Sequence, residues 1–419
     1  MTAALPAVAP RAGLAGWSLF AALIAMAGLP IYIHAPKFYV DTYGVSLAAL
    51  GGMLALLRLF DVVQDPVLGW LAEAGRARRG LWVAIAAGLM ALAMIGLFAV
   101  APPIAPLLWF ALTLSVLFTA FSFLTIVFYA EGVAKAATLG PNGHVRLAGW
   151  REGGSLMGVC LAAVAPVALA ALSPQPFAAF ALGFAVLAVL AVWAMSREWT
   201  GGGAPAGNPL ALFRPVLADP LARRLLLIAL LNAAPVAVTS TLFLFFVESR
   251  LAAPGMEGPL LLLFFLAAAI STPIWSRFAQ QYGLRRVLLA GMGLAILSFL
   301  WAATLGAGDT LAFAVICAAS GAALGADMVL LPAIFARRLA HLGQGGEGAA
   351  FGLWSFVSKL SLALAAATLL PALDAAGFVP GAQNAPSALA ALSVFYALVP
   401  CALKVLAIAL LAITKIPEV

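Results

Sequence analysis

Long apolar stretches separated by short polar segments run through almost the whole chain. Each stretch is close to the roughly 20 residues that an α-helix needs to cross the hydrocarbon core of a bilayer. The pattern predicts twelve membrane-spanning helices, near residues 14–36, 45–72, 81–101, 106–130, 146–172, 177–196, 222–247, 258–278, 285–304, 309–336, 349–373 and 388–414. We therefore predict an all-α membrane protein.

Composition and charge agree with this prediction. The chain is 65% hydrophobic and 9% charged, whereas soluble domains carry roughly 25% charged residues. Most of the 22 Lys and Arg residues flank one set of loops, and only Lys37 and Arg250 flank the other. Positive charge favours the cytoplasmic side, so we expect both termini in the cytoplasm of a bacterial inner (plasma) membrane. The net charge of +7 then reflects topology, and we expect no nucleic-acid partner.

A sequence repeat divides the chain into halves. Pro273 follows Pro66 by 207 residues, and each proline precedes an Arg pair at the same spacing, Arg78 and Arg79 or Arg285 and Arg286. Two six-helix halves joined by a central loop are the plan of the major facilitator transporters. We predict a first half at 1–196, a cytoplasmic loop at 197–221 and a second half at 222–419. The Arg pairs are candidates for gating contacts between helices, or they only determine topology.

One predicted span carries a stripe of charge. Helical geometry places Arg58, Asp61 and Asp65 within about 60° of arc on one face. A charge at the centre of a bilayer costs roughly 2.5–3.5 kcal/mol on insertion scales, so such residues point to a function. Two carboxylates one turn apart predict a site for a cation or a proton, with Gln64 and Thr119 as further oxygen donors at a similar depth.

Two basic residues in other spans are candidate partners of this stripe. Arg151 opens the fifth span and Lys359 lies in the eleventh, 208 residues later, so a basic residue is present in both equivalent helices. Asp61 and Asp65 are the natural partners of Lys359. The pair is either a structural link between the halves or a switchable element of transport, and buried pairs are poor stabilisers.

Other residues add little chemistry. Trp150 and Trp354 neighbour Arg151 and Lys359 in sequence and either pack on a solute or fill the interface. The three cysteines lack the spacing of a metal site, and no nucleophile–base set or nucleotide-binding motif is present. We therefore expect no enzyme activity and no cofactor.

The second-span region resembles a known family. A Tyr-x-Asp-x-x-Gly segment precedes an Arg-x-x-Asp-x-x-x-Asp-Pro stretch, formed by Tyr39, Asp41, Gly44, Arg58, Asp61, Asp65 and Pro66. Together with Arg151, Lys359 and Ser355, this pattern resembles the glycoside–pentoside–hexuronide:cation symporters, the melibiose permease-like family of the major facilitator superfamily.

The resemblance implies roles for individual residues. Asp61 and Asp65 would bind the coupling ion, Na⁺ or H⁺, with Thr119 and Gln64 as further ligands and Lys359 beside them. Residues implied at the solute are Arg151, Lys359, Ser122 and Ser355. Ala25 and Ser122 replace two carboxylates that hold sugar hydroxyls in this family, and Ile126 replaces an aromatic residue that packs on the sugar.

The sequence thus predicts a cation-coupled symporter of a small polar solute, a sugar or glycoside by resemblance. A carrier of an amphiphile such as a lysophospholipid, or a proton-coupled exporter, is the alternative. A membrane assembly or sensor protein without transport activity is a third class. We expect a monomer whose partners are the solute, a monovalent cation and the lipid bilayer.

Overall fold

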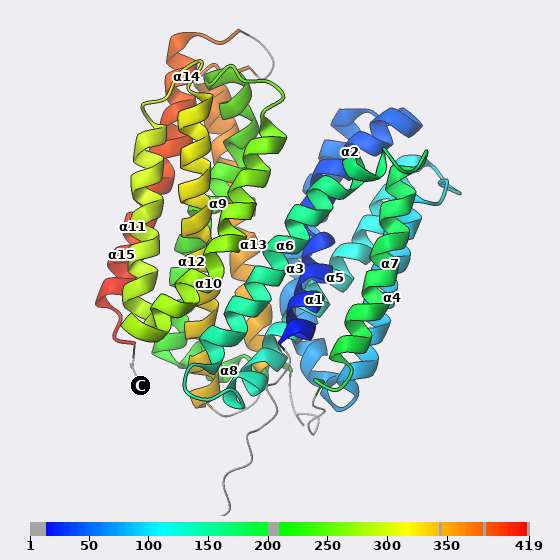
Figure 1. Ribbon diagram of the computed structural model, residues 1–419, viewed down its shortest axis with the longest axis vertical. Coiled ribbons are helices and arrows are strands. Elements are labelled where there is room, and N and C mark those ends of the chain that lie inside the picture. The colour runs from blue at the N-terminus through cyan, green and yellow to red at the C-terminus, as the bar shows by residue number, and fades with distance from the viewer. Residues whose placement is uncertain (1–13, 200–208, 343–345, 380–382, 417–419) are drawn as a thin grey trace, which may run out of the picture.

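The computed structural model describes residues 14–199, 209–342, 346–379 and 383–416, which are almost entirely helical and contain no strand in these ranges (Figure 1). The first half comprises α1 (Ala15–Met26), α2 (Leu29–Tyr43), α3 (Leu47–Ala74), η1 (Arg76–Arg78), α4 (Arg79–Phe98), α5 (Pro106–Ala137), α6 (Gly143–Leu169) and α7 (Pro176–Met195). The second half comprises α9 (Pro220–Phe245), η3 (Phe246–Arg250), α10 (Glu257–Tyr282), α11 (Leu284–Ala302), α12 (Thr310–Leu342), α13 (Glu347–Ala375), α14 (Pro386–Ser393), η4 (Val394–Leu398) and α15 (Val399–Ile413).

These helices follow the predicted spans closely. Ten of them, within the described ranges, are long and apolar enough to cross a bilayer. The 28-residue α3 matches the second predicted span and contains the charged stripe. The first predicted span is divided between α1 and α2. With the first and second spans, the described residues account for the predicted twelve, and the prediction of an all-α, two-part major facilitator fold is confirmed.

The break in the first span has a local cause. Gly28 lies between α1 and α2 in a non-helical conformation, and a proline follows within the first turn of α2. Proline lacks the N–H that would continue the α1 hydrogen bonds, but it is tolerated at a helix start. Elsewhere, polar caps begin the helices: the hydroxyl of Ser46 accepts a hydrogen bond from Ala49 N at the start of α3.

The segment between the halves is partly helical rather than a plain loop. It contains η2 (Pro209–Leu212) and α8 (Arg214–Ala218), while residues 200–208 of the predicted loop lie outside the described residues. Figure 1 shows α8 at one end of the molecule, which we call the linker end. The two helix groups meet at this end and diverge toward the opposite end, where α2 and α14 lie.

Buried apolar packing follows the same arrangement. One continuous cluster crosses the two halves and joins Phe20, Phe128 and Leu147 to Phe335 and Phe351. A second cluster, containing Phe246, Phe313 and Tyr396, is formed by second-half residues alone. The halves are thus packed together near the linker end, and the second half has a core of its own.

Candidate cation-binding site

A close crossing of α3 and α13 holds the acidic stripe against the second half. Gly69 on α3 faces Gly348 and Gly352 on α13, and a Cβ added at Gly69 would lie 2.8 Å from the Gly348 carbonyl oxygen. Helix backbones approach this closely only where side chains are small. Asp65 lies one turn before Gly69, and its carbonyl oxygen would lie 2.8 Å from a Cβ at Gly352. Glycine at these positions therefore places Asp65 at the interface between the halves.

Lys359 reaches across this interface from α13. Its Nζ donates hydrogen bonds to Asp61 Oδ1 at 2.8 Å and to Asp65 Oδ1 at 3.0 Å. The side chain of Asp65 is fully buried, and those of Asp61 and Lys359 are 11% and 18% exposed. The structure thus brings together the two carboxylates and the lysine that the sequence analysis paired.

Three polar side chains complete this cluster. Ser122 on α5 accepts a hydrogen bond from Lys359 Nζ at 2.6 Å and donates one to Asp61 Oδ1 at 3.0 Å. Gln64 Nε2 donates to Asp61 Oδ1 at 2.9 Å, and Thr119 Oγ1 donates to Gln64 Oε1 at 2.9 Å. Ser122, implied at the solute by resemblance, therefore belongs to the charged cluster. Gln64 presents its N–H to Asp61 and its carbonyl to Thr119.

The charge of the cluster is unbalanced. Two carboxylates face one ammonium group, so Asp61, Asp65 and Lys359 together carry a net charge of −1. The Oδ2 atom of Asp65 is buried and has no hydrogen-bond partner among the described residues. A buried oxygen without a partner is costly, and one added monovalent cation or proton would neutralise the cluster. Arg58, the third member of the stripe, lies half-buried one turn before Asp61 on α3.

Arg151 lies in a separate buried cluster. Its Nε donates to Glu152 Oε1 at 2.8 Å, and its guanidinium carbon lies 3.5 Å from the centre of the Tyr129 ring. The hydroxyl of Tyr129 donates to the same Glu152 oxygen at 2.7 Å. Tyr129 also packs against Phe351 of the second half, with ring centres 5.3 Å apart. These contacts fix Arg151 between α5 and α6 near the crossing of the halves.

Arg151 and Lys359 lie in equivalent helices but at different levels along them. A crossing of α6 and α10 mirrors that of α3 and α13: a Cβ at Gly153 would lie 3.1 Å from Thr272 Oγ1. Arg151 lies two residues from Gly153, at the level of this crossing. Lys359 lies two turns beyond Gly352, about 10 Å further along its helix. The repeat spacing relates helices but does not fix how far each is displaced along its axis.

The other residues suggested for the solute, Trp150, Trp354 and Ser355, are divided between α6 and α13. Trp150 is 50% exposed on α6, and its carbonyl oxygen accepts a hydrogen bond from Ser18. Trp354 is half-buried on α13, packed 4.9 Å from the Phe335 ring. Ser355 is half-buried one turn before Lys359. Of these three residues, only Ser355 lies on the face of α13 that carries Lys359.

At the linker end, the halves are held together by charged contacts as well as by the close packing of α3 on α13 at the glycines. Arg76 Nη1 lies 3.5 Å from Glu347 Oε2 across the halves, and Glu73 Oε1 accepts a hydrogen bond from Gly348 N at 2.5 Å. Arg79, predicted as a gating residue, is buried. Its Nη1 lies 2.6 Å from Glu131 Oε2 within the first half. Arg76, rather than Arg79, forms the contact between the halves.

The remaining predicted gating residues differ from one another. Arg78 and Arg286 are exposed. Arg285 donates a hydrogen bond to the Ala412 carbonyl oxygen at the end of α15. The two Arg pairs that repeat in sequence therefore make different contacts in the two halves.

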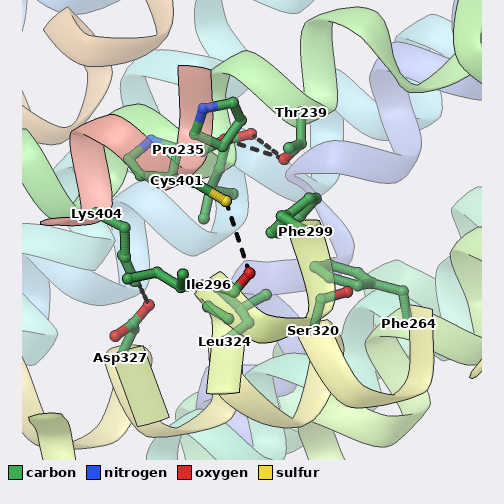
Figure 2. A pocket seen from close by; sticks show the side chains of 13 residues that line it. Pro235, Thr239, Phe264, Ile296, Phe299, Ser320, Leu324, Asp327, Cys401 and Lys404 are labelled. Carbon is green, nitrogen blue, oxygen red and sulfur yellow. Dashed lines mark hydrogen bonds and ion pairs between the residues drawn. The ribbon is translucent and has the colours of Figure 1, made fainter. Parts of the chain in front are cut away.

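A second buried charge cluster lies inside the second half. Lys404 on α15 donates to Asp327 on α12 and, at 2.7 Å, to Asn232 Oδ1 on α9. Figure 2 shows Asp327 and Lys404 facing each other beside a cavity of about 30 Å³, which is large enough for a water molecule. Asp327 Oδ1 is buried without a hydrogen-bond partner among the described residues. In the sequence, the only indication of this pair is that Asp327 and Lys404 each lie as a charged residue within a predicted apolar span.

Comparisons with known proteins identify relatives of the whole chain. The family model described as MFS/sugar transport protein matches residues 14–418. A crystal structure of a bacterial homologue of the iron transporter ferroportin in an outward-facing state is similar in fold, with a TM-score of 0.69 and 16% sequence identity. The match covers 95% of this chain and 98% of that one, and a second structure of that homologue with soaked iron matches equally well.

Proposed function

The chain belongs to the MFS/sugar transport protein family, and we propose that it couples one monovalent cation, Na⁺ or H⁺, to the movement of a small polar solute. The protein is a membrane transporter of the major facilitator superfamily. The observation that carries the proposal is the cluster of Asp61, Asp65 and Lys359, which spans the two halves with a net charge of −1.

The direction of opening follows from charge. Lys and Arg residues are concentrated near the linker end, and positive charge favours the cytoplasmic side of a membrane. We assign the linker end to the cytoplasm. The halves then meet at the cytoplasmic side and diverge toward the outside (Figure 1).

Neutralisation of the cluster links the ion to the conformational change. Closing the outer side would remove water from Asp61 and Lys359, which are partly exposed. Burying a net charge is costly unless it is paired. A bound cation or proton reduces the net charge to zero and makes the closed arrangement accessible. Moving one charge across the membrane supplies about 2.3 kcal/mol per 100 mV.

Opening of the cytoplasmic side must separate α3 from α13. This motion would break the contact of Arg76 with Glu347 and the packing of Gly69 on Gly348. The hydrogen bonds from Lys359 to the two aspartates cross the same interface. Separation of the halves would therefore remove Lys359 of the second half from the ion site on the first half.

The test measures charge movement and does not require the solute to be identified first. Proteoliposomes adsorbed on a solid-supported membrane are given a Na⁺ jump at constant ionic strength or a pH jump, and the transient current is recorded. We expect a current with one of the two ions in wild type and its loss in Asp61→Asn and Asp65→Asn. Asp374→Asn, an exposed acid at the end of α13, serves as the matched control. Equal currents in all four proteins would refute the cation assignment.

The same preparation distinguishes the solute classes. Addition of a glycoside in the presence of the active ion should produce a further current if the solute is glycoside-like. A response to lysophosphatidylcholine instead would assign the protein to amphiphile transport. Because Ala25 and Ser122 stand where carboxylates would hold sugar hydroxyls, the test uses a panel of glycosides rather than a single sugar.

A further inference from the structure

An apolar groove lies on the first half. It has a volume of about 540 Å³ and is lined by side chains of α3, α4 and α5. This volume falls in the range of about 300–1,000 Å³ that is typical of small-molecule sites. Its lining is almost wholly apolar, with Ser115 and Thr119 as the hydroxyl-bearing residues.

The groove is open to the bilayer along its length. Phe60, Leu71, Trp82 and Leu89 line it and are between 41% and 51% exposed. In a membrane protein, such exposed apolar side chains face lipid. Gly75, at one end, follows Phe60 by four turns of helix, roughly 22 Å. This is longer than half of the hydrocarbon core, which is about 30 Å thick. The groove therefore extends through the hydrocarbon region of one leaflet.

A positive charge lies beside the linker end of the groove. Trp82 packs over Gly75 there, and tryptophan is enriched at the membrane–water interface. Arg78 lies four residues before Trp82, is exposed, and has no ion pair among the described residues. Its neighbours Arg76 and Arg79 are paired with glutamates. Arg78 is thus the cation available to a ligand that enters from the interface.

We propose that this groove binds one acyl chain of an anionic phospholipid from the linker-side leaflet, with the phosphate group at Arg78. An elongated apolar channel with a cation at its interfacial end matches the shape and charge of that ligand. Basic residues attract anionic lipids at the cytoplasmic face by about 1 kcal/mol each. The inner end of the chain lies beside Thr119, whose hydroxyl donates to Gln64. The lipid thus reaches a residue that orients the ion cluster.

Native mass spectrometry of the purified full-length protein tests this site. The protein is incubated with phosphatidylglycerol or phosphatidylcholine of identical acyl chains, and retained lipid is counted. We expect one retained lipid, with about fivefold preference for phosphatidylglycerol, the factor that corresponds to about 1 kcal/mol. Arg78→Gln should remove the preference, and Arg286→Gln, an exposed arginine of the second half, should not.

A pair of tryptophan substitutions on α4 tests the groove itself. Leu89 lines the groove and Leu92 does not, although both face lipid. Leu89→Trp should abolish retention of both lipids, whereas Leu92→Trp should behave as wild type. Both positions are exposed, so melting temperatures should stay close to wild type. Equal binding of the two lipids to wild type, unchanged preference in Arg78→Gln, or retention by Leu89→Trp would each overturn the proposal. The readout is independent of transport.

Discussion

Replacement of Lys359 by methionine changes the charge of the ion cluster from −1 to −2 with little change in side-chain length. Removing one partner of a buried ion pair costs about 3–5 kcal/mol. Because Lys359 and Asp61 are 18% and 11% exposed, water screens part of the remaining repulsion, and we expect a loss of about 3 kcal/mol, the lower end of that range. For a chain of this size the loss corresponds to a fall in melting temperature of about 3 °C.

The same substitution should strengthen cation binding. A positive charge about 4 Å away opposes a second cation by up to about 4 kcal/mol at an effective dielectric constant of 20. Without Lys359, the active ion should therefore bind more tightly and recover most of the lost stability. A ligand at 100 times its Kd stabilises the folded state by about 2.7 kcal/mol, which is close to the predicted loss.

Thermal unfolding in detergent, with and without the active ion, measures both effects. Lys415→Met, at an exposed lysine beyond α15, is the control. We expect a lower melting temperature without the ion and a larger ion-induced rise for Lys359→Met alone. A melting temperature within about 1 °C of wild type, together with an unchanged ion response, would refute it.

Three further predictions concern packing and charge elsewhere in the chain. Gly352→Ala should lower the melting temperature, because its Cβ would lie 2.8 Å from a backbone oxygen of α3, although Ala in an open helix position usually stabilises by about 0.5–1 kcal/mol. Lys404→Met should cost about 3–5 kcal/mol by leaving a buried aspartate, and adding Asp327→Asn should restore most of this loss; equal unfolding curves of the single and double variants would argue against the pair. Hydrogen bonds from Arg338 lower the pKa of Asp219 at the start of α9. The charged pair therefore stabilises the fold above the ordinary Asp pKa of about 4 and stops doing so as pH falls through the lowered pKa. Asp219→Asn should cost up to about 1 kcal/mol at pH 7, and melting curves at pH 3 to 8 should converge with wild type at the acid end.

The sequence predicted the features that depend on hydrophobicity and on neighbours along one helix. Span positions follow from apolar length, and the shared face of Asp61 and Asp65 follows from helical periodicity alone. The pairing with Lys359 was predictable because a base deep in an apolar span needs an acidic partner, and few acids are available at that depth.

The features that were missed depend on how helices are placed relative to one another. Arg151 differs from Lys359 in depth because glycines set the crossing of α6 with α10, and a repeat offset carries no information on that displacement. Ser122 reaches the ion cluster because α5 faces α3 and α13 at that level. The pairing of Lys404 with Asp327 required knowing that α12 and α15 are neighbours.

The break after Ala27 shows a further limit of the sequence. A proline within an apolar run either bends a helix or begins a new one. The hydrophobic pattern of 14–36 is the same in both cases. The conformation of Gly28, which differs from that of a helix, decides between them and is visible only in the structure.

We propose that Asp61, Asp65 and Lys359 form a site for a single monovalent cation. Thermal shift of the purified wild type and of the Asp61→Asn/Asp65→Asn variant, with Na⁺, Li⁺ or K⁺ over a range of pH, tests it most directly. We expect wild type to be stabilised by Na⁺ or, if the coupling ion is H⁺, to show a pH-dependent shift instead. The double variant should show neither response. Equal ion and pH responses of the two proteins would contradict it.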